Sequence, residues 1–400
     1  MTYLLPLAVL AGIALYLLTP DERRRLFRAT ADAAGGLLRD ALRAGPEDEP
    51  FRTALRARTR WAAAVPAIVL LNVAVFVRAA WAPGSLADPA ALMAWGANYA
   101  PVTTSGEWWR VLTAPFLHHG PLHLLATLAG LVPLGLILER WIGSAAFAAL
   151  YLGAGVIAAL VGLSAAPVDV VAGAGGAVLG VYGLLAACAL WALVRRPPFR
   201  VPIRIVRTVA VNGALFLLYT VLDGSLGIEA ALAGFATGFA GGMALARGVS
   251  AAKPPVRRVA AAAAAAVVIA VVSAIPLRGL VNVLPELERA AAFEARTAAA
   301  YAEAVGEFRK GWTSGDELAS LIDGTILPEL DAARVRLQAL GKVPPEHQPL
   351  IAAAAEYFEL REQAWRRRSE GLRTANLRKL QDAERLERTA LEAFGRMRAG

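Results

Sequence analysis

The chain has 400 residues, of which 57% are hydrophobic and 18% are charged, and its formal net charge is +9. This composition departs from that of globular proteins toward that of polytopic membrane proteins. The positive charge does not indicate a nucleic-acid partner, because residues 281–400 contain 18 basic and 19 acidic side chains and the excess flanks apolar segments instead. We therefore expect a lipid bilayer, and no nucleic acid, as the environment of this protein.

Apolar segments recur along the chain at lengths suited to a membrane. A helix needs about 17–25 residues to cross ~30 Å of hydrocarbon. Eight segments approach or reach this length, at residues 3–19, 61–82, 119–138, 145–163, 172–194, 207–222, 228–246 and 258–275. The sequence thus predicts an all-α polytopic membrane protein with a six-helix core, one extra helix at each end and a C-terminal helical domain.

Basic residues predict the orientation of these helices. Residues 21–60 are rich in arginine, and no cleavage site separates them from the first apolar segment, which we interpret as a retained helix. By the positive-inside rule, this basic segment is cytoplasmic. Alternation then places the N-terminus and the C-terminal domain outside the cytoplasm, with the protein in a bacterial-type inner membrane. The later basic residues assigned to the cytoplasmic face are Arg140, Arg195, Arg196, Arg200, Arg204, Arg207, Arg247, Lys253, Arg257 and Arg258.

Five parts follow from these patterns. They are an extra transmembrane helix at 1–20, a basic cytoplasmic linker at 21–60, the six-helix core at 61–250, an additional transmembrane helix at 258–276 and an extracytoplasmic helical domain at 281–400. Pro254 and Pro255 mark the end of the core, because consecutive prolines cannot continue a helix.

The C-terminal domain carries helix signals of its own. Ser314 and Glu317 have the spacing of a capping box, which begins a helix. Pro344 and Pro345 precede a long helix that Gly371 is expected to interrupt. One face of that helix is apolar at spacings of three, four and seven residues, at Leu350, Ala354, Tyr357, Phe358, Trp365 and Leu372.

Short motifs between residues 106 and 183 resemble those of the rhomboid family. They include Trp109-Arg110, then His118, His119 and His123, and then the Gly-rich start of the fourth core helix at 173–183. Their order and spacing are similar to those of rhomboids inside an independently predicted six-helix core. The resemblance implies a rhomboid fold and, for the family, intramembrane serine proteolysis.

The same resemblance implies that the catalytic positions have changed. Rhomboids place a serine at the start of the fourth core helix, a histidine on the sixth, and an oxyanion-binding His and Asn on the second. Gly175 and Ala231 stand at the serine and histidine positions. His123 matches the oxyanion histidine, and Thr127 replaces the asparagine. We expect no catalytic residue here, only an oxyanion-like remnant.

Glycines stand at helix-packing positions of the core, although the catalytic positions have changed. They lie on the fourth and sixth core helices, where small residues let backbones approach closely in lipid, although glycines can also pack in any bundle. These positions are Gly176, Gly180, Gly183, Gly234, Gly238 and Gly242.

His119 and His123 share a helix face, which raises the possibility of a metal site. Glu107, Asp169 and Glu229 are candidate third ligands, but none is placed beside the pair by the pattern. We expect no metal and no cofactor.

These observations favour a pseudoprotease that binds transmembrane segments of client proteins without cleaving them, with a possible extracytoplasmic partner for residues 281–400. Two alternatives stay open. One is an active rhomboid endopeptidase with an unrecognised nucleophile, for which Ser164 and Ser225 are candidates. The other is a membrane-anchored assembly factor that acts through its C-terminal domain.

Overall fold

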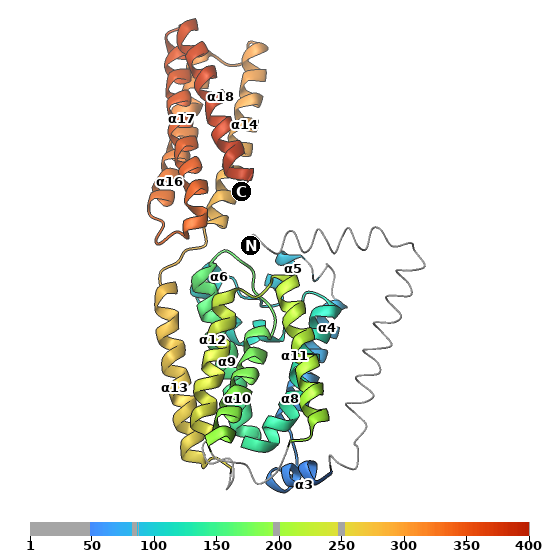
Figure 1. The fold of residues 1–400 in the computed structure, drawn as a ribbon. Coiled ribbons are helices and arrows are strands. Elements are labelled where there is room, and N and C mark those ends of the chain that lie inside the picture. Colours follow the sequence, from blue (N-terminus) through green and yellow to red (C-terminus); the bar gives the residue numbers. More distant parts are fainter. Residues whose placement is uncertain (1–48, 82–85, 87, 195–200, 247–252, 400) are drawn as a thin grey trace, which may run out of the picture. The chain divides into compact units, whose positions relative to one another are not determined.

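A computed structural model describes residues 49–81, 86, 88–194, 201–246 and 253–399. The predicted helix at 1–20 and most of the linker at 21–60 lie outside the described residues. The described residues divide into two units, one drawn from residues 49–88, 115–158 and 173–270 and the other from residues 89–114, 159–172 and 271–399. All named elements in the described part of the chain are helices, which confirms the predicted all-α class (Figure 1).

Membrane-length apolar helices occupy the predicted positions. The helices α8–α13 are long and apolar enough to cross a membrane, and α4 is a shorter apolar helix. Their bounds are α4 (Ala64–Ala80), α8 (Pro121–Ile142), α9 (Ser144–Ala165), α10 (Gly175–Val194), α11 (Ile203–Asp223), α12 (Ile228–Leu245) and α13 (Val256–Ala274). Helix α3 (Glu49–Arg58) comes before them, and the short η3 (Ile275–Leu277) follows α13.

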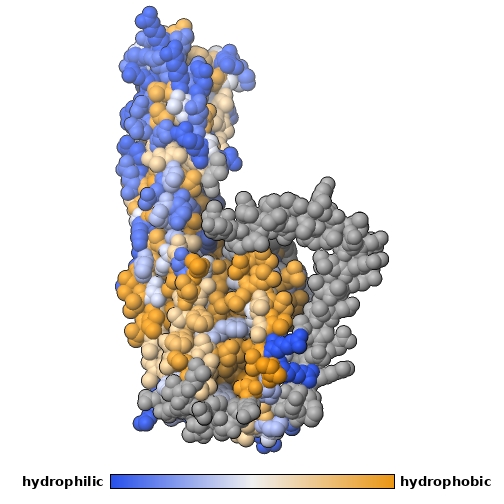
Figure 2. Space-filling model, in the orientation of Figure 1, coloured by the Kyte–Doolittle hydropathy of each residue, from blue (hydrophilic) through white to orange (hydrophobic). Residues whose placement is uncertain are grey.

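Burial separates these helices into central and peripheral ones. Of the membrane-spanning part of α10, 56% is buried, against 11% for α11 and 0% for α13. The peripheral helices expose large apolar side chains such as Leu218 and Val272, and Figure 2 shows a hydrophobic surface over the helices of this unit. Such exposure is unfavourable in water and expected of lipid-facing helices. The chain is therefore an integral membrane protein.

A buried carboxylate fixes the start of α4. Glu139 on α8 is fully buried, and its Oε1 accepts hydrogen bonds from the backbone N–H of Ala63 at 2.6 Å and Ala64 at 2.7 Å. Its Oε2 accepts from Val65 N–H at 2.8 Å, and the Ser144 hydroxyl donates to Oε1 at 2.5 Å. The first N–H groups of a helix have no partner within the helix, so this carboxylate satisfies them and ties α4 to α8.

The second unit combines short loop helices with a C-terminal bundle. The loop helices are α5 (Pro89–Ala94), α6 (Ala100–Thr104) and α7 (Arg110–Thr113), and the short η2 (Ala114–Phe116) follows them. The bundle is formed by α14 (Leu284–Arg309), α15 (Gly315–Leu321), the π-helical η4 (Ile322–Ile326), α16 (Leu327–Gln338), η5 (Pro345–His347), α17 (Gln348–Arg373) and α18 (Leu377–Ala399).

The helix signals of the bundle are mostly confirmed. Ser314 and Glu317 form the predicted capping box at the start of α15. The predicted apolar face of α17 packs into the bundle core. Gly371 does not interrupt α17, which continues to Arg373. A Cβ at Gly371 would lie 2.8 Å from Leu380 Cδ2, so this glycine makes room for α18 instead of ending the helix.

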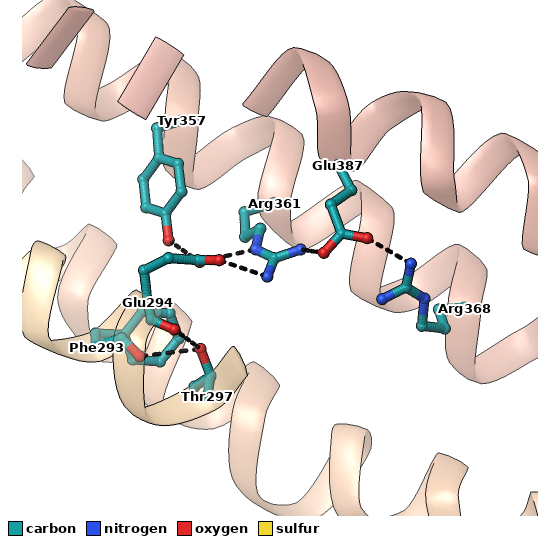
Figure 3. A network of polar contacts seen from close by, with 7 residues as sticks. All are labelled: Phe293, Glu294, Thr297, Tyr357, Arg361, Arg368 and Glu387. Atoms are coloured by element: carbon teal, nitrogen blue, oxygen red, sulfur yellow. Dashed lines mark hydrogen bonds and ion pairs between the residues drawn. The ribbon is translucent and has the colours of Figure 1, made fainter. Parts of the chain in front are cut away.

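A buried network of charged residues joins three helices of the bundle (Figure 3). Arg361 on α17 has 2% of its side chain exposed and donates to both oxygens of Glu294 on α14, at 2.9 and 2.7 Å. The Tyr357 hydroxyl also donates to Glu294, at 2.5 Å, and Arg361 reaches Glu387 on α18 at 2.6 Å. Although burial acts to lower the pKa of Arg361, the two carboxylates raise it above its ordinary value. The network holds α14, α17 and α18 in one register.

Candidate functional site

The backbones of helices α10 and α12 are in direct contact at several glycines. A Cβ added to Gly238 would lie 1.8 Å from Gly180 O, and one added to Gly234 would lie 2.2 Å from Gly176 O. On the facing helix, a Cβ at Gly183 would lie 2.1 Å from Phe235 O. Only glycine fits such positions, because the obstructing atoms are backbone and cannot rotate away.

Small residues continue this packing. Gly242 on α12 faces Ala187 on α10, and a Cβ added to Gly242 would lie 2.7 Å from Ala187 Cβ. Gly176 on α10 also packs against α9, where its added Cβ would lie 2.4 Å from Ala158 Cβ. The structure thus brings together the small residues that the sequence singles out. It also aligns the start of α10 with the start of α12.

The start of α10 faces a histidine ring. Gly173 has φ +117°, and a Cβ there would lie 2.5 Å from His123 Cε1 and 2.6 Å from His123 Nε2. Gly175 is the first residue of α10, and a Cβ on it would lie 3.1 Å from Leu226 Cδ2. Ala231 is half-buried in the first turn of α12, packed against the core of this unit. Glycine and alanine supply no nucleophile and no base at these two helix starts.

His123 belongs to a hydrogen-bonded chain that the sequence pattern does not reveal. Its Nδ1 lies 2.8 Å from Nδ1 of His119, and His119 Nε2 lies 2.9 Å from Asp223 Oδ1 at the end of α11. The Tyr219 hydroxyl donates to the same Oδ1 at 2.9 Å, and its ring stacks on His123 at 5.9 Å between centroids. These hydrogen bonds link the start of α8 to the last turn of α11.

Proton positions along this chain decide what His123 can offer. If His119 is neutral, its Nε2–H donates to Asp223 and its Nδ1 accepts from His123 Nδ1–H. The Nε2 atom of His123, which faces Gly173, is then an acceptor. If His119 is protonated, it donates at both nitrogens and His123 carries its proton on Nε2. A donor suited to an oxyanion exists only in the second arrangement.

Two further polar side chains of this region are buried. His118 is 1% exposed, with its ring 4.8 Å from that of His123, and burial lowers the pKa of His118 to about 4. Thr127 is also 1% exposed, and its Oγ1 has no hydrogen-bond partner among the described residues. The structure therefore places Thr127 on α8 one turn beyond His123, without giving it a polar contact.

Trp109 and Arg110 brace the loop helices. Arg110 is buried and donates to the carbonyl oxygens of Met93 at 2.6 Å and Ala97 at 3.0 Å, while its Nε bonds Glu107 at 2.8 Å. Its guanidinium lies 4.9 Å from the centroid of the Trp109 ring. These contacts hold α5 and α7 together, so the motif is structural within this unit.

Asp223 and Tyr219 are the residues that sequence reasoning missed. In the described part of the chain, His119, His123 and Asp223 form a group of potential metal ligands whose ligand atoms lie within 4.8 Å of one another. The third ligands considered from the sequence, Glu107, Asp169 and Glu229, are not members of it. Asp223 follows His119 by 104 residues and shares no motif with it. Its only sequence signal is a lone acidic residue at the end of an apolar segment.

Comparison with known proteins shows similarity to rhomboids over the central part of the chain. The rhomboid domain model matches residues 105–248. The chain is 36% identical over 107 residues to the rhomboid protease GluP of Bacillus subtilis (27% of this chain, 21% of that protein) and 38% identical over 81 residues to the putative rhomboid protease YdcA of the same organism (20% and 41%). It is 34% identical over 65 residues to inactive RHOMBOID-like protein 8 of Arabidopsis thaliana (16% and 18%).

These matches cover less than half the length of each relative. No solved structure matches the chain. The relatives include proteases and a protein named as inactive, so the similarity alone leaves the activity open. The matched segment contains the helices that carry the glycine contact and the histidine cluster, and over this segment the chain is similar to the rhomboid domain.

Proposed function

We propose that this protein is a rhomboid-like pseudoprotease, which binds transmembrane segments or partner proteins without cleaving them. The observation that carries the proposal is the pair of helix starts at which Gly175 and Ala231 stand. Peptide hydrolysis by a serine enzyme needs a nucleophile and a base within hydrogen-bond reach. All four histidines of the chain, His118, His119, His123 and His347, lie outside α12.

The arrangement of His123 supports the same proposal. His123 presents a donor toward Gly173 only when His119 is protonated. When His119 is neutral, His123 presents a lone pair there, whereas stabilising an oxyanion requires donors. Thr127 offers no compensating contact. Loss of both nucleophile and base removes the covalent route, since the members of such a unit act together and catalysis collapses when either is lost.

Peripheral helix α11 supports binding of transmembrane segments. It exposes a row of large apolar side chains, Leu215, Leu217, Leu218, Val221 and Leu222. Association of helices in lipid rests on close packing, and a client helix adds contacts to such a face.

We further propose that residues 281–400 bind an extracytoplasmic partner. We also propose that the protein resides in a bacterial inner membrane, with its N-terminus and C-terminal domain outside the cytoplasm.

Labelling of the native protein tests the inactive assignment. The full chain, purified in detergent, is treated with a fluorescent fluorophosphonate and separately incubated with a model transmembrane substrate. We expect neither labelling nor cleavage, while an active rhomboid protease in parallel shows both. Labelling that is lost in Ser225→Ala or Ser164→Ala would establish the alternative of an active enzyme with an unrecognised nucleophile.

Partial restoration gives a second test. We expect Gly175→Ser alone to stay unlabelled, because a serine at this position still lacks a base. The added Cβ meets only the flexible end of Leu226 at 3.1 Å, so the variant should fold. Labelling of Gly175→Ser would show that a base is present and would contradict the proposed loss of the dyad.

Photo-crosslinking tests client binding. A photoreactive amino acid at Leu218, exposed on α11, should trap transmembrane proteins in native membranes. The matched control is the same amino acid at Val272 on α13, also exposed. Equal crosslinking at both positions would indicate random collision in the bilayer and would count against α11 as a binding face.

A further inference from the structure

The cluster formed by His119, His123 and Asp223 has the composition of a metal site. One nitrogen from each imidazole and one carboxylate oxygen lie within 4.8 Å of one another. Imidazole with carboxylate suits first-row divalent metals such as Zn²⁺. Three protein ligands with a free fourth position are typical of zinc sites that keep a water or exchangeable ligand.

The candidate ligand atoms must move closer together to receive a metal. Ligand atoms bound to tetrahedral Zn²⁺ at about 2.0–2.2 Å lie about 3.4 Å from one another. The 2.8 Å contact uses Nδ1 of His119 and the 2.9 Å contact uses its Nε2, so a single ion can take only one of these two nitrogens. With one ligand atom from each residue, the three atoms lie within 4.8 Å of one another, and rotation of the histidine or aspartate side chains would have to bring them to the shorter spacing.

Free acceptor capacity and outer contacts favour a cation at this place. Asp223 Oδ2 is buried and accepts no hydrogen bond within 3.5 Å among the described residues, although the Ser225 side chain also interacts with this carboxylate, and the Asp223 side chain as a whole is 14% exposed. Tyr219 donates to Oδ1 and stacks on His123, so it orients both groups. Ligands held by outer hydrogen bonds in this way are typical of metal sites. The His119 side chain is 27% exposed, so the cluster is not fully buried.

We propose that His119, His123 and Asp223 bind a divalent transition-metal ion, with Zn²⁺ as the fitting representative. The ion joins the start of α8 to the end of α11, and Tyr219 acts as a positioning residue for the carboxylate. This inference does not depend on whether the protein cleaves substrates. It differs from the sequence-based expectation of no metal.

Metal titration of the full chain tests the proposal. The protein in detergent is stripped with a chelator and titrated with Zn²⁺ against a chromophoric competitor, and then with Co²⁺ followed by visible absorption. We expect one saturable site per chain and a Co²⁺ spectrum of tetrahedral type that Zn²⁺ abolishes. Failure of the wild-type chain to bind either ion at micromolar concentration overturns the proposal and leaves the cluster as a hydrogen-bonded chain only.

Variants separate the proposed ligands from other side chains. His119→Ala and Asp223→Asn should each weaken Zn²⁺ binding by more than the 10–100-fold typical of outer-contact loss, and Tyr219→Phe by about 10-fold. Glu229→Gln, which alters an acidic residue outside the cluster, should bind as the wild type does. Unchanged affinity in Asp223→Asn contradicts the assignment. If the ligand variants do not fold, the wild-type titration and the Tyr219→Phe measurement still decide.

Discussion

The contact between α10 and α12 makes a quantitative prediction for Gly238→Ala. The added Cβ would lie 1.8 Å from Gly180 O and 2.6 Å from Gly180 Cα, whereas a carbon–oxygen contact normally measures about 3.3 Å or more. The two helices must therefore separate locally by about 1.5 Å. Overpacking costs about 1–3 kcal/mol, and we expect the upper end because both obstructing atoms are backbone.

Part of this cost is offset by helix propensity. Alanine is favoured over glycine in a helix by up to about 1 kcal/mol, which leaves a net loss of about 2 kcal/mol. At about 2–4 °C per kcal/mol for a domain of this size, the melting temperature should fall by roughly 4–8 °C. The matched control is Gly241→Ala on the same helix, where the added Cβ meets only the side-chain end of Leu150 at 3.1 Å. We expect the control to stay within about 2 °C of the wild type.

The single cysteine of the chain provides the assay. Cys188 lies half-buried in α10, so a fluorogenic thiol reagent reports the unfolding of the helix that carries Gly180. The C-terminal bundle has no cysteine and contributes no signal. Thermal curves of wild type, Gly238→Ala and Gly241→Ala are compared in the same detergent. Coincident curves for the two variants would refute the inference that α10 and α12 touch through backbone atoms.

Three further outcomes follow from the buried charges. Arg361→Met leaves Glu294 buried without its arginine and should destabilise the bundle by on the order of 3–5 kcal/mol, measured by thermal unfolding followed by tryptophan fluorescence. Arg366→Met is the control, because the Arg366 side chain is 65% exposed and its loss should cost about 0–1 kcal/mol. Equal losses in the two variants would contradict the network. Glu139→Gln replaces one carboxylate oxygen by an NH₂ group, so an N–H at the start of α4 loses its acceptor, and the Cys188 assay should show a loss of about 1–3 kcal/mol. Burial acts to raise the pKa of Glu387, but Arg361 and Arg368 outweigh burial and hold that pKa below its ordinary value. The folded state therefore binds fewer protons than the unfolded state, so the stability of the bundle should fall as the pH drops below about 5. Glu387→Gln should flatten this dependence of stability on pH.

Local sequence patterns predicted the parts of this fold that depend on nearby residues. The predicted apolar segments became the shorter apolar helix α4 and the membrane-length helices α8–α13, because the bilayer requires helices with internally satisfied backbones. The Ser314 capping box formed because both of its hydrogen bonds lie within one helical turn. The apolar face of α17 follows directly from helical periodicity.

Gly371 shows the limit of that reasoning. A glycine in a helix has the same local propensity whether it breaks the helix or admits a neighbour, and here the approach of Leu380 decides. The buried pair Arg361 and Glu294 is likewise formed by residues 67 positions apart, on helices that only packing brings together.

The candidate site divides in the same way. The identities of Gly175, Ala231 and His123, together with a family resemblance, were enough to direct the functional proposal away from proteolysis. The partner of His119 was not accessible to such reasoning. Asp223 is one acidic residue among 32 acidic side chains, and only the packing of α11 against the start of α8 places its carboxylate 2.9 Å from an imidazole. Hydropathy and periodicity in the sequence indicate which face of a helix is apolar. Which helices become neighbours depends on side-chain packing across the whole domain. The packing of α11 against the start of α8 therefore creates the cluster of His119, His123 and Asp223.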